Sequence, residues 1–336
     1  MRLLACLLMI LPGLSMAQSS AELIARTVDQ HVMPRYLVLA DRTADLRDVA
    51  QGDCQADSPD LRQAYGAAFD AWVGVSHLRF GPSEVDNRAF ALAFWPDTRG
   101  ATPKALGALV AASDPVAETG AAYAEVSIAA RGFYALEFLL YDPALQGAGT
   151  AEYRCQLIRT VTEDIAAQAA GILTDWQNGY ADQMKTQGPD SPYRDQTEAM
   201  RQLFSALTTG LEFTANVRLG RPLGTYDRPR ATRAEARRSN RSQRHVALSL
   251  EALRDLALHL AEGQPEATGA LVVEFDRTQA FVVALDDPVF AGVDDPQKRL
   301  KVEMIQQAVQ SIDAVAKQTL GPALGVAAGF NALDGD

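Results

Sequence analysis

The sequence predicts an all-α fold made of two packed helical bundles. First, almost every long segment repeats apolar residues at three- and four-residue steps, as Ala130, Phe133, Leu136 and Leu140 do. Second, no segment shows the sustained apolar–polar alternation of a half-buried strand. Third, a Gly- and Pro-rich linker at 188–192 separates two halves that each have about four long helices. A duplicated four-helix unit is therefore a hypothesis, although residue-level repetition is not visible.

The helices expected before the linker cover residues 21–50, 58–80, 121–141 and 150–184. Pro34 predicts a kink in the first, since a proline inside a helix removes one backbone hydrogen bond. Ser58 and Pro59 are typical of a helix start, and Gly81 with Pro82 is expected to end the second helix. Residues 82–120 contain several prolines and are expected to form short turns that pack over the bundle.

The helices expected after the linker cover residues 193–219, 233–262, 265–285 and 296–320, with a loop at 220–232. Pro265 and Pro296 each stand at the first position of their helix. Proline is favoured there because a backbone N–H at that position makes no hydrogen bond within the helix. We therefore divide the mature chain into an N-terminal bundle, residues 18–188, and a C-terminal bundle, residues 193–336, which together form one domain.

The first 17 residues have the composition of a signal peptide. Arg2 precedes an apolar run that Pro12 and Gly13 interrupt, and the small residues Ser15 and Ala17 frame a cleavage site after Ala17. No later stretch contains about 18 consecutive uncharged apolar residues, so no transmembrane helix is predicted after it. The expected location of the mature protein is the periplasm.

Two cysteines, Cys54 and Cys155, remain once the leader is removed. An even number of cysteines in an exported protein favours one disulfide, and two buried free thiols are the alternative. In the chain-entropy model, a disulfide that closes a loop of about 100 residues contributes roughly 4–5 kcal/mol of stability.

The charge balance bears on the class of partner. Acidic residues exceed basic residues by 11. This excess argues against nucleic acid as a partner, because binding to phosphates needs clustered Lys and Arg. It suits a protein that handles cations, but solubility alone is the more common explanation of such a surface.

Residues 129–141 are the most informative stretch. Tyr134 and Glu137 are three residues apart, so a helix places them on one face. Glu137 stands between Leu136 and Phe138, and a carboxylate beside apolar packing needs a partner, which makes it a candidate site residue. A solvated Glu on an exposed stripe is the alternative. Gly132 within the helical pattern can mark the close approach of a neighbouring segment.

Two further groups of residues carry potential chemistry. His77 is expected near a helix C-terminus, which favours its charged form, but a lone histidine is more often structural than a ligand. Seven arginines fall within 17 positions, namely Arg228, Arg230, Arg233, Arg237, Arg238, Arg241 and Arg244. Guanidinium groups bind carboxylates and phosphates in bidentate fashion, so one or two of these arginines near a cleft could recognise an anion. Ion pairs with the acidic surface are the alternative for most of them.

Several pieces of sequence, spread over nearly all the mature chain, resemble the imelysin family, which is named after a metallopeptidase. They are Pro34-Arg35-Tyr36, the A-W-x-x-x-x-H-x-R-F-G-P run at 71–82, residues 87–90 with 94–97, residues 132–140, Tyr153-Arg154-Cys155, Arg221-Pro222-Leu223-Gly224 and the tail 324–336. The resemblance implies a fold of two helical bundles with the motif residues near their interface.

The hallmark of the family is the motif G-x-H-x-x-E. Gly132 and Glu137 match it, whereas Tyr134 replaces the histidine. Members with the intact motif are thought to bind a metal through that His and Glu. A neutral phenol, whose pKa is about 10, is a poor ligand for zinc or ferrous iron, so zinc is not expected and no residue is expected to be catalytic. Tyrosinate does bind ferric iron, which keeps iron or haem iron as a candidate.

The resemblance also implies a site and two hypotheses about function. The cleft between the bundles is expected to gather Glu137, Tyr134, His77, Arg79 and Arg241. Because the family includes iron-regulated periplasmic or surface proteins, the first hypothesis is a non-enzymatic protein of iron or haem acquisition. It would bind an iron species or an anionic iron complex, and membrane transport components are its expected partners. The second hypothesis is a metallopeptidase that uses Glu137. A scaffold for a membrane partner is a further option that does not depend on the resemblance.

Overall fold

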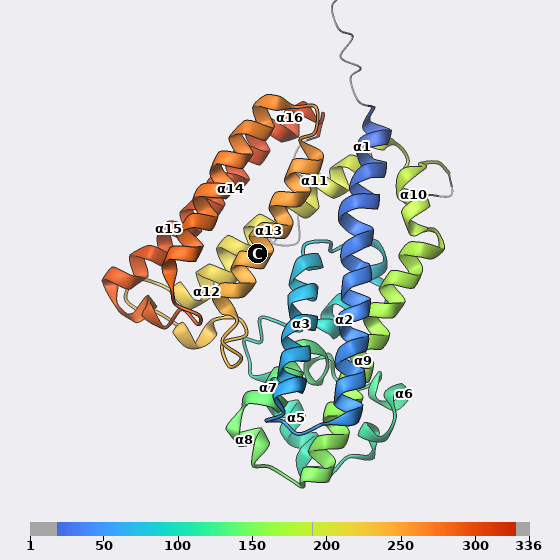
Figure 1. Ribbon diagram of the computed structural model, residues 1–336, viewed down its shortest axis with the longest axis vertical. Helices are drawn as coiled ribbons and strands as arrows, with labels where there is room; N and C mark the ends of the chain where they lie inside the picture. Colours follow the sequence, from blue (N-terminus) through green and yellow to red (C-terminus); the bar gives the residue numbers. More distant parts are fainter. Residues whose placement is uncertain (1–18, 190, 327–336) are drawn as a thin grey trace, which may run out of the picture.

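The computed structural model describes residues 19–189 and 191–326, so the predicted signal peptide and the end of the tail lie outside the described residues. The described chain is helical and contains no strand, apart from one isolated bridge between Thr225 and Arg228. The helices form two groups, one drawn in blue to green and one in yellow to red (Figure 1). The predicted all-α fold of two packed bundles is therefore confirmed.

The N-terminal bundle is built around one long helix that runs the length of the molecule (Figure 1). It consists of α1 (Ser20–Thr27), a π-turn η1 (Val28–Val32) and α2 (Met33–Gly52). Pro34 stands just after the π-turn, so the predicted break takes this form. Helix α2 packs against α3 (Pro59–Val75) and α9 (Ala151–Asp175), and α7 (Gly132–Tyr141) packs against α9.

Within residues 191–326, the C-terminal bundle contains four long helices. They are α11 (Gln196–Glu212), α13 (Ser242–Leu260), α14 (Pro265–Leu285) and α15 (Pro296–Val315), with α14 packed against both α13 and α15. A π-turn, η7 (Phe213–Leu219), continues α11 into α12 (Gly220–Leu223), and a second, η10 (Ala316–Leu320), continues α15 into α16 (Gly321–Ala323). The helices expected at 265–285 and 296–320 are thus confirmed.

Shorter elements complete the N-terminal bundle. They are η2 (Gly81–Ser83), η3 (Val85–Asn87), α4 (Arg88–Leu92), α5 (Ala101–Ala112), η4 (Pro115–Glu118), α6 (Gly120–Tyr123), η5 (Ile128–Ala130), α8 (Pro143–Gln146), η6 (Trp176–Tyr180) and α10 (Ala181–Lys185). In the C-terminal bundle the short elements are η8 (Ala231–Arg233) and η9 (Ala291–Asp294). The irregular region expected at 82–120 is confirmed.

The two bundles meet along named helices. Helix α3 packs against α13, and α1 contacts both α11 and α13. The first helix therefore belongs to both bundles: its lower part lies in the N-terminal core, and its upper part touches the C-terminal helices (Figure 1). This arrangement places residues of α3 and η1 opposite residues of α13.

The prediction of one helix over residues 121–141 is wrong. The segment breaks into α6, the turn η5 and α7, because Gly132 adopts a left-handed conformation with a φ of 75°. A Cβ atom at Gly132 would lie 2.2 Å from the backbone oxygens of Ala91 and Leu92. Gly132 is therefore the start of α7 and the point where the chain at 91–92 approaches it, which is the close approach that the sequence suggested.

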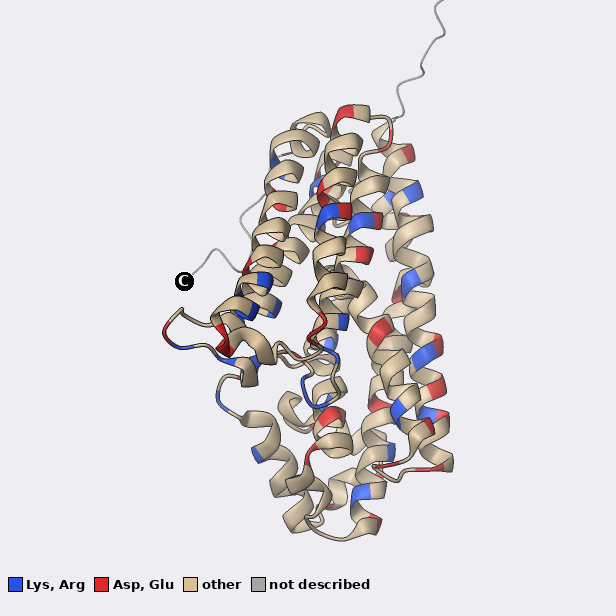
Figure 2. Ribbon diagram, turned by 60° about the vertical axis from the view of Figure 1, so that its left-hand side comes forward, with Lys and Arg blue, Asp and Glu red and all other residues tan. Residues whose placement is uncertain are grey.

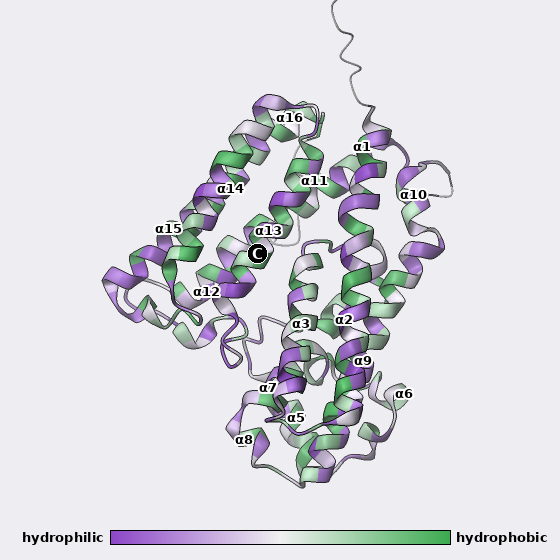
Figure 3. Ribbon diagram, in the orientation of Figure 1, coloured by the Kyte–Doolittle hydropathy of each residue, from purple (hydrophilic) through white to green (hydrophobic). Residues whose placement is uncertain are grey.

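Two other predicted helices are too long. The helix expected at 58–80 ends at Val75, so His77 and Arg79 lie in the irregular segment after it. The helix expected at 233–262 begins only at Ser242, and residues 234–241 form an irregular segment in which Ala236 and Asn240 have positive φ angles. We call residues 234–241 the interface segment. Figure 3 shows the connection between α12 and α13, which contains it, as largely hydrophilic.

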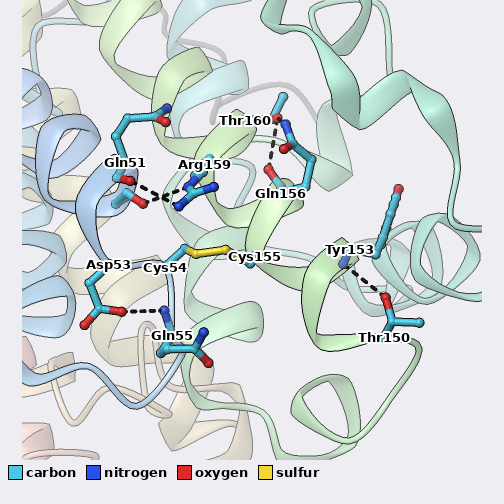
Figure 4. Close-up of a disulfide and its surroundings, with 11 residues drawn as sticks. Gln51, Asp53, Cys54, Gln55, Thr150, Tyr153, Cys155, Gln156, Arg159 and Thr160 are labelled. Carbon is cyan, nitrogen blue, oxygen red and sulfur yellow. Dashed lines mark hydrogen bonds between the residues drawn. A yellow bond between two sulfur atoms is a disulfide. The ribbon is translucent and has the colours of Figure 1, made fainter.

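A disulfide joins Cys54, just after α2, to Cys155 in α9, which confirms the predicted pairing (Figure 4). The two Cα atoms are 5.0 Å apart and the bond closes a separation of 101 residues. Nearby, Arg159 of α9 donates to the backbone oxygens of Ala50 and Gln51 (Figure 4). The C-terminal end of α2 is therefore fixed to α9 both covalently and by hydrogen bonds.

Within the part of the chain that the structure describes, no helix is long and apolar enough to cross a membrane. Acidic and basic residues are distributed over the helices of both bundles (Figure 2). Many of these charges are in ion pairs at the surface, such as Arg42 with Asp45 and Arg26 with Glu262. Ion pairs of this exposed kind contribute little to stability.

Candidate functional site

Tyr134 lies in the first turn of α7 and reaches the C-terminal bundle. Its hydroxyl donates a hydrogen bond to Glu235 of the interface segment. Glu235 in turn accepts a hydrogen bond of 2.8 Å from Nε of Arg218, which lies in the π-turn η7. Glu235 is 2% exposed and Arg218 is 3% exposed. Tyr134 is thus part of a buried polar chain that crosses from the N-terminal to the C-terminal bundle.

The protonation states of this chain follow from its geometry. Burial alone would raise the pKa of Glu235, but Arg218, His245 and the Tyr134 hydroxyl together lower this pKa to about 2. Burial, and then the charge of Glu235, raises the pKa of Tyr134 well above its ordinary value. Glu235 is therefore ionised and Tyr134 keeps its proton.

Arg218 connects the chain to residues on both sides of the interface. It donates to Ser249 of α13 at 3.4 Å and to Ser76, just after α3, at 3.2 Å. His245 of α13 has its Nδ1 atom 3.4 Å from Glu235, but neither ring nitrogen makes a hydrogen bond. Burial is the main cause that lowers the pKa of His245, which leaves the imidazole neutral.

Glu137 faces the interface segment one turn further along α7. Its Oε1 atom accepts hydrogen bonds from the backbone N–H of Ser239 at 2.9 Å and from the Ser239 hydroxyl at 2.7 Å. Glu137 is 3% exposed. Burial raises its pKa, while the two bonds from Ser239 and the charges of Arg238 and Arg237 oppose that rise.

Glu137 and Tyr134 form part of the wall of a pocket of about 250 Å³. The opposite wall comes from the C-terminal bundle and includes Arg221, residues 232–234 and residues 236–238. Aromatic residues of the N-terminal bundle complete the pocket, with Phe94, Trp95 and Phe138 among them. The structure thus places the two motif residues at a pocket between the bundles.

The other three expected site residues lie elsewhere. Arg79 forms a surface ion pair with Glu84 at 2.7 Å. Arg241 pairs with Asp70 and donates to the backbone oxygen of Gly66 at 2.9 Å. His77 contacts His31, as described below, and none of the three lines the pocket. The resemblance placed them in the cleft with Glu137, but the observed hydrogen-bond partner of Glu137 is Ser239. Ser239 can reach Glu137 because the helix expected at 233–262 begins nine residues later.

A second polar chain, which we call the histidine chain, crosses the same interface. The Nδ1 atom of His31 lies 2.7 Å from Asp255 of α13, and its Nε2 atom lies 2.9 Å from Nε2 of His77. Since an ionised carboxylate only accepts, we assign the proton of His31 to Nδ1, and His77 then donates through Nε2. Arg35 also pairs with Asp255, at 3.1 Å.

Both histidines of this chain are neutral. Burial is the main cause that lowers the pKa of His31 from 6.5 to about 4, against the attraction of Asp255. Burial also lowers the pKa of His77, and the nearby His31, Arg35 and Arg218 lower it further. Nothing in the sequence pairs His31 with His77, because 46 residues separate them.

The metal that the family motif implies does not fit these residues. Tyr134 is protonated and donates to Glu235, so it offers no anionic oxygen to a metal. Glu235 is already neutralised by the guanidinium of Arg218, whose positive charge would repel a cation placed there. Across residues 19–189 and 191–326 there is no group of three or more His, Cys, Asp or Glu side chains that could hold a metal ion.

Sequence reasoning missed Glu235, Arg218 and Ser239. Glu235 and Ser239 fall in a stretch whose apolar spacing suggested a helix, and they contact α7 across more than a hundred positions. The cluster of arginines was the available signal, since Arg233, Arg237 and Arg238 of that cluster line the pocket. Arg221, quoted for the resemblance alone, lines it as well.

Comparison with known proteins gives a consistent picture. The imelysin family model matches residues 32–316. The chain is similar in structure to an imelysin-like protein from Psychrobacter arcticum, with a TM-score of 0.78 and 20% identity over 94% of this chain and 99% of that chain. It is also similar to a "putative iron-regulated protein A precursor" from Parabacteroides distasonis, with a TM-score of 0.75 and 14% identity over 90% of this chain and 95% of that chain. A search of curated proteins gives no match.

Proposed function

This chain belongs to the imelysin family, and we propose that it is a non-enzymatic binding protein that acts in iron acquisition in the periplasm. One observation carries the proposal: Tyr134, which the resemblance matches to a metal-binding histidine, is a neutral tyrosine that donates to the buried pair of Glu235 and Arg218. Iron is then a cargo that the pocket between the bundles takes up, not a resident cofactor.

Each part of the proposal has its own support. The solved neighbour described as iron-regulated supports a role in iron acquisition. The signal-peptide pattern of residues 1–17 supports a periplasmic location. We add membrane transport components as partners, because iron captured in the periplasm has to be handed to a protein that crosses the inner membrane.

A metallopeptidase that uses Glu137 is the second candidate, and one observation favours it. Glu137 is buried beside a pocket and its pKa is raised, as is typical of a carboxyl group that exchanges protons in catalysis. Against it, Oε1 of Glu137 is held by two hydrogen bonds from Ser239, and the guanidinium of Arg218 disfavours a catalytic cation near Tyr134.

Cleavage of an unfolded protein distinguishes the two candidates. The mature protein is incubated with reduced, unfolded casein, with zinc or ferrous iron added and with or without a chelator. We expect no cleavage above the buffer control, because no metal-activated water can form beside a protonated Tyr134. The matched samples are Glu137→Ala and a variant at an exposed acid, Glu118→Ala.

Chelator-sensitive cleavage that is lost in Glu137→Ala and kept in Glu118→Ala would establish the peptidase and overturn the proposal. Absence of cleavage in all samples, together with uptake of iron by the intact protein, supports the binding role.

A further inference from the structure

The walls of the pocket carry more basic than acidic side chains. Four arginines line it: Arg221, Arg233, Arg237 and Arg238. Arg238 is engaged, since it pairs with Asp142 at 2.9 Å and stacks on Phe138 with its guanidinium carbon 3.7 Å from the ring centroid. Among the described residues, Arg221, Arg233 and Arg237 form no ion pair with an acidic side chain. Three guanidinium groups therefore remain for a ligand.

The acidic residues of the pocket wall are committed to other donors. Both carboxylate oxygens of Asp97 accept backbone N–H bonds at the start of α5, from Ala101 at 2.9 Å and Thr102 at 2.9 Å. Glu137 accepts two hydrogen bonds from Ser239. Neither carboxylate forms a salt bridge with one of the three free arginines.

Arg221 shows most clearly that a partner is missing. Its Nε atom is buried and has no hydrogen-bond partner. Its guanidinium carbon lies 5.8 Å from the centroid of the Trp95 ring, which itself stacks with Tyr134 at a centroid distance of 6.1 Å. Burial lowers the pKa of Arg221, and the like charge of Arg233 lowers it further. An arginine that is desolvated and close to another arginine is stabilised when an anion binds between them.

The size and walls of the pocket restrict the class of anion. Its volume is about 250 Å³, which is below the roughly 300–1,000 Å³ of pockets that hold drug-sized ligands. Haem, a large flat macrocycle, is therefore too big for it. A small molecule with several carboxylates matches both the volume and the fork geometry of the guanidinium groups.

We infer that this pocket binds a small polycarboxylate of the citrate type, with Arg221, Arg233 and Arg237 as the residues that determine its specificity. The inference rests on the proposed function for the identity of the cargo: ferric iron enters as the chelate of such a polycarboxylate, and the arginines hold the carboxylates of the chelator. The protein then recognises the chelator, and the metal needs no side-chain ligand.

Calorimetric titration at low ionic strength tests the inference. The mature protein is titrated with iron-free citrate, ferric citrate, acetate and haemin. We expect citrate and ferric citrate to bind, and acetate and haemin not to bind. In Arg221→Met and Arg237→Met the affinity for citrate should fall about tenfold or more, since each variant removes charge-assisted hydrogen bonds. The control is Arg228→Met. Arg228 is an exposed arginine between α12 and α13 that does not line the pocket, so this variant should bind citrate as the wild type does.

Glu137→Gln separates recognition of the chelator from ligation of the metal. An anion pocket loses nothing when a carboxylate is removed from its wall, so Glu137→Gln should bind ferric citrate at least as tightly as the wild type. Binding that is abolished by Glu137→Gln and unaffected by Arg221→Met would overturn the inference, because it would make Glu137 a metal ligand. Circular dichroism and the thermal midpoint of each variant show that it is folded.

The outcomes also separate this inference from the proposed function. Iron taken up equally by the wild type, Arg221→Met and Arg237→Met would refute the polycarboxylate site while iron acquisition stands. Citrate bound through the arginines, with ferric citrate excluded, would support the site and refute the iron cargo. If neither citrate nor ferric citrate binds, the inference is refuted.

Discussion

At the residue scale, the centre of the interface is the ion pair between Glu235 and Arg218. Both side chains are almost fully buried, and the pair is completed by the hydroxyl of Tyr134 and by two serines. A buried ion pair is costly to form, but it is far more costly to break by removing one partner, because the other charge then stays buried alone. The identity of residue 134 is tied to this pair, since a phenol can donate to an ionised carboxylate without adding charge.

Glu235→Gln should lower the free energy of unfolding by about 3–5 kcal/mol, because Arg218 loses its counter-charge while it stays buried. Urea unfolding followed by circular dichroism measures the change. The matched control is Glu274→Gln, which removes one partner of the more exposed pair with Arg277 on α14 and should cost about 1 kcal/mol or less. Equal effects of the two substitutions would contradict the role given to Glu235.

At the element scale, two breaks in predicted helices create the site. Gly132 begins α7 in a left-handed conformation and lets the backbone at 91–92 approach. The interface segment delays the start of α13 to Ser242 and brings Glu235 and Ser239 to α7. Each break has a local cause in backbone conformation that apolar spacing does not report.

Gly132→Ala should destabilise the protein by at least about 3 kcal/mol, since the new Cβ atom would meet two backbone oxygens and the backbone would be held at a positive φ. Gly107→Ala is the matched control, because Gly107 lies inside α5 and a Cβ atom there meets no atom within 4 Å. That variant should gain roughly 0.5–1 kcal/mol from helix propensity. Thermal unfolding of both variants gives the comparison, and a tolerated Gly132→Ala would refute the account of this turn.

The histidine chain predicts a pH dependence at the same scale. The pKa of His31 is about 4 in the folded protein and 6.5 in its ordinary state, so between these values the unfolded chain binds more protons than the folded one. The contribution of His31 to the free energy of unfolding therefore rises with pH across this window. This contribution is complete above about pH 6.5 and is lost as the pH falls toward about 4. The lowered pKa of His77 changes stability with pH in the same direction. The charged or titratable groups that face the two histidines are Asp255, Arg35, His259 and Arg218.

Urea unfolding at pH 7 and pH 5 measures this effect. The glutamine of His31→Gln is neutral at both pH 7 and pH 5. From pH 7 to pH 5, the variant should therefore lose less unfolding free energy than the wild type, by on the order of 1 kcal/mol per pH unit. His259→Gln, at the partly exposed rim of the chain, should keep most of the wild-type slope. Identical slopes for the wild type and His31→Gln would show that His31 does not titrate in this window.

Sequence reasoning succeeded where structure is local and failed where it is not. The starts of α3, α14 and α15 were predictable, because a proline at the first helical position marks each of them. The shared face of Tyr134 and Glu137 was predictable from their spacing. The partners of these two residues were not, because Glu235 and Ser239 come from an irregular segment about a hundred positions away.

At the scale of the whole molecule, the two bundles are held together by polar chains instead of a purely apolar contact. The hydrogen bond from Tyr134 to Glu235 and the contact of His31 with Asp255 each link the first 188 residues to the last 144, and the pocket lies at the same interface. The proposed boundary of the bundles at 188–192 remains a prediction. A ligand held between the bundles would add a third polar link, so its binding should raise the thermal midpoint by mass action.

We propose that the protein carries chelated iron and holds no catalytic zinc, and competitive uptake of the two metals tests this proposal. The mature protein is dialysed to equilibrium against equal concentrations of ferric citrate and zinc chloride, and both metals are then measured by mass spectrometry against protein concentration. We predict iron close to one atom per chain and zinc at the background level of a control protein. One zinc per chain with iron at background would contradict the account.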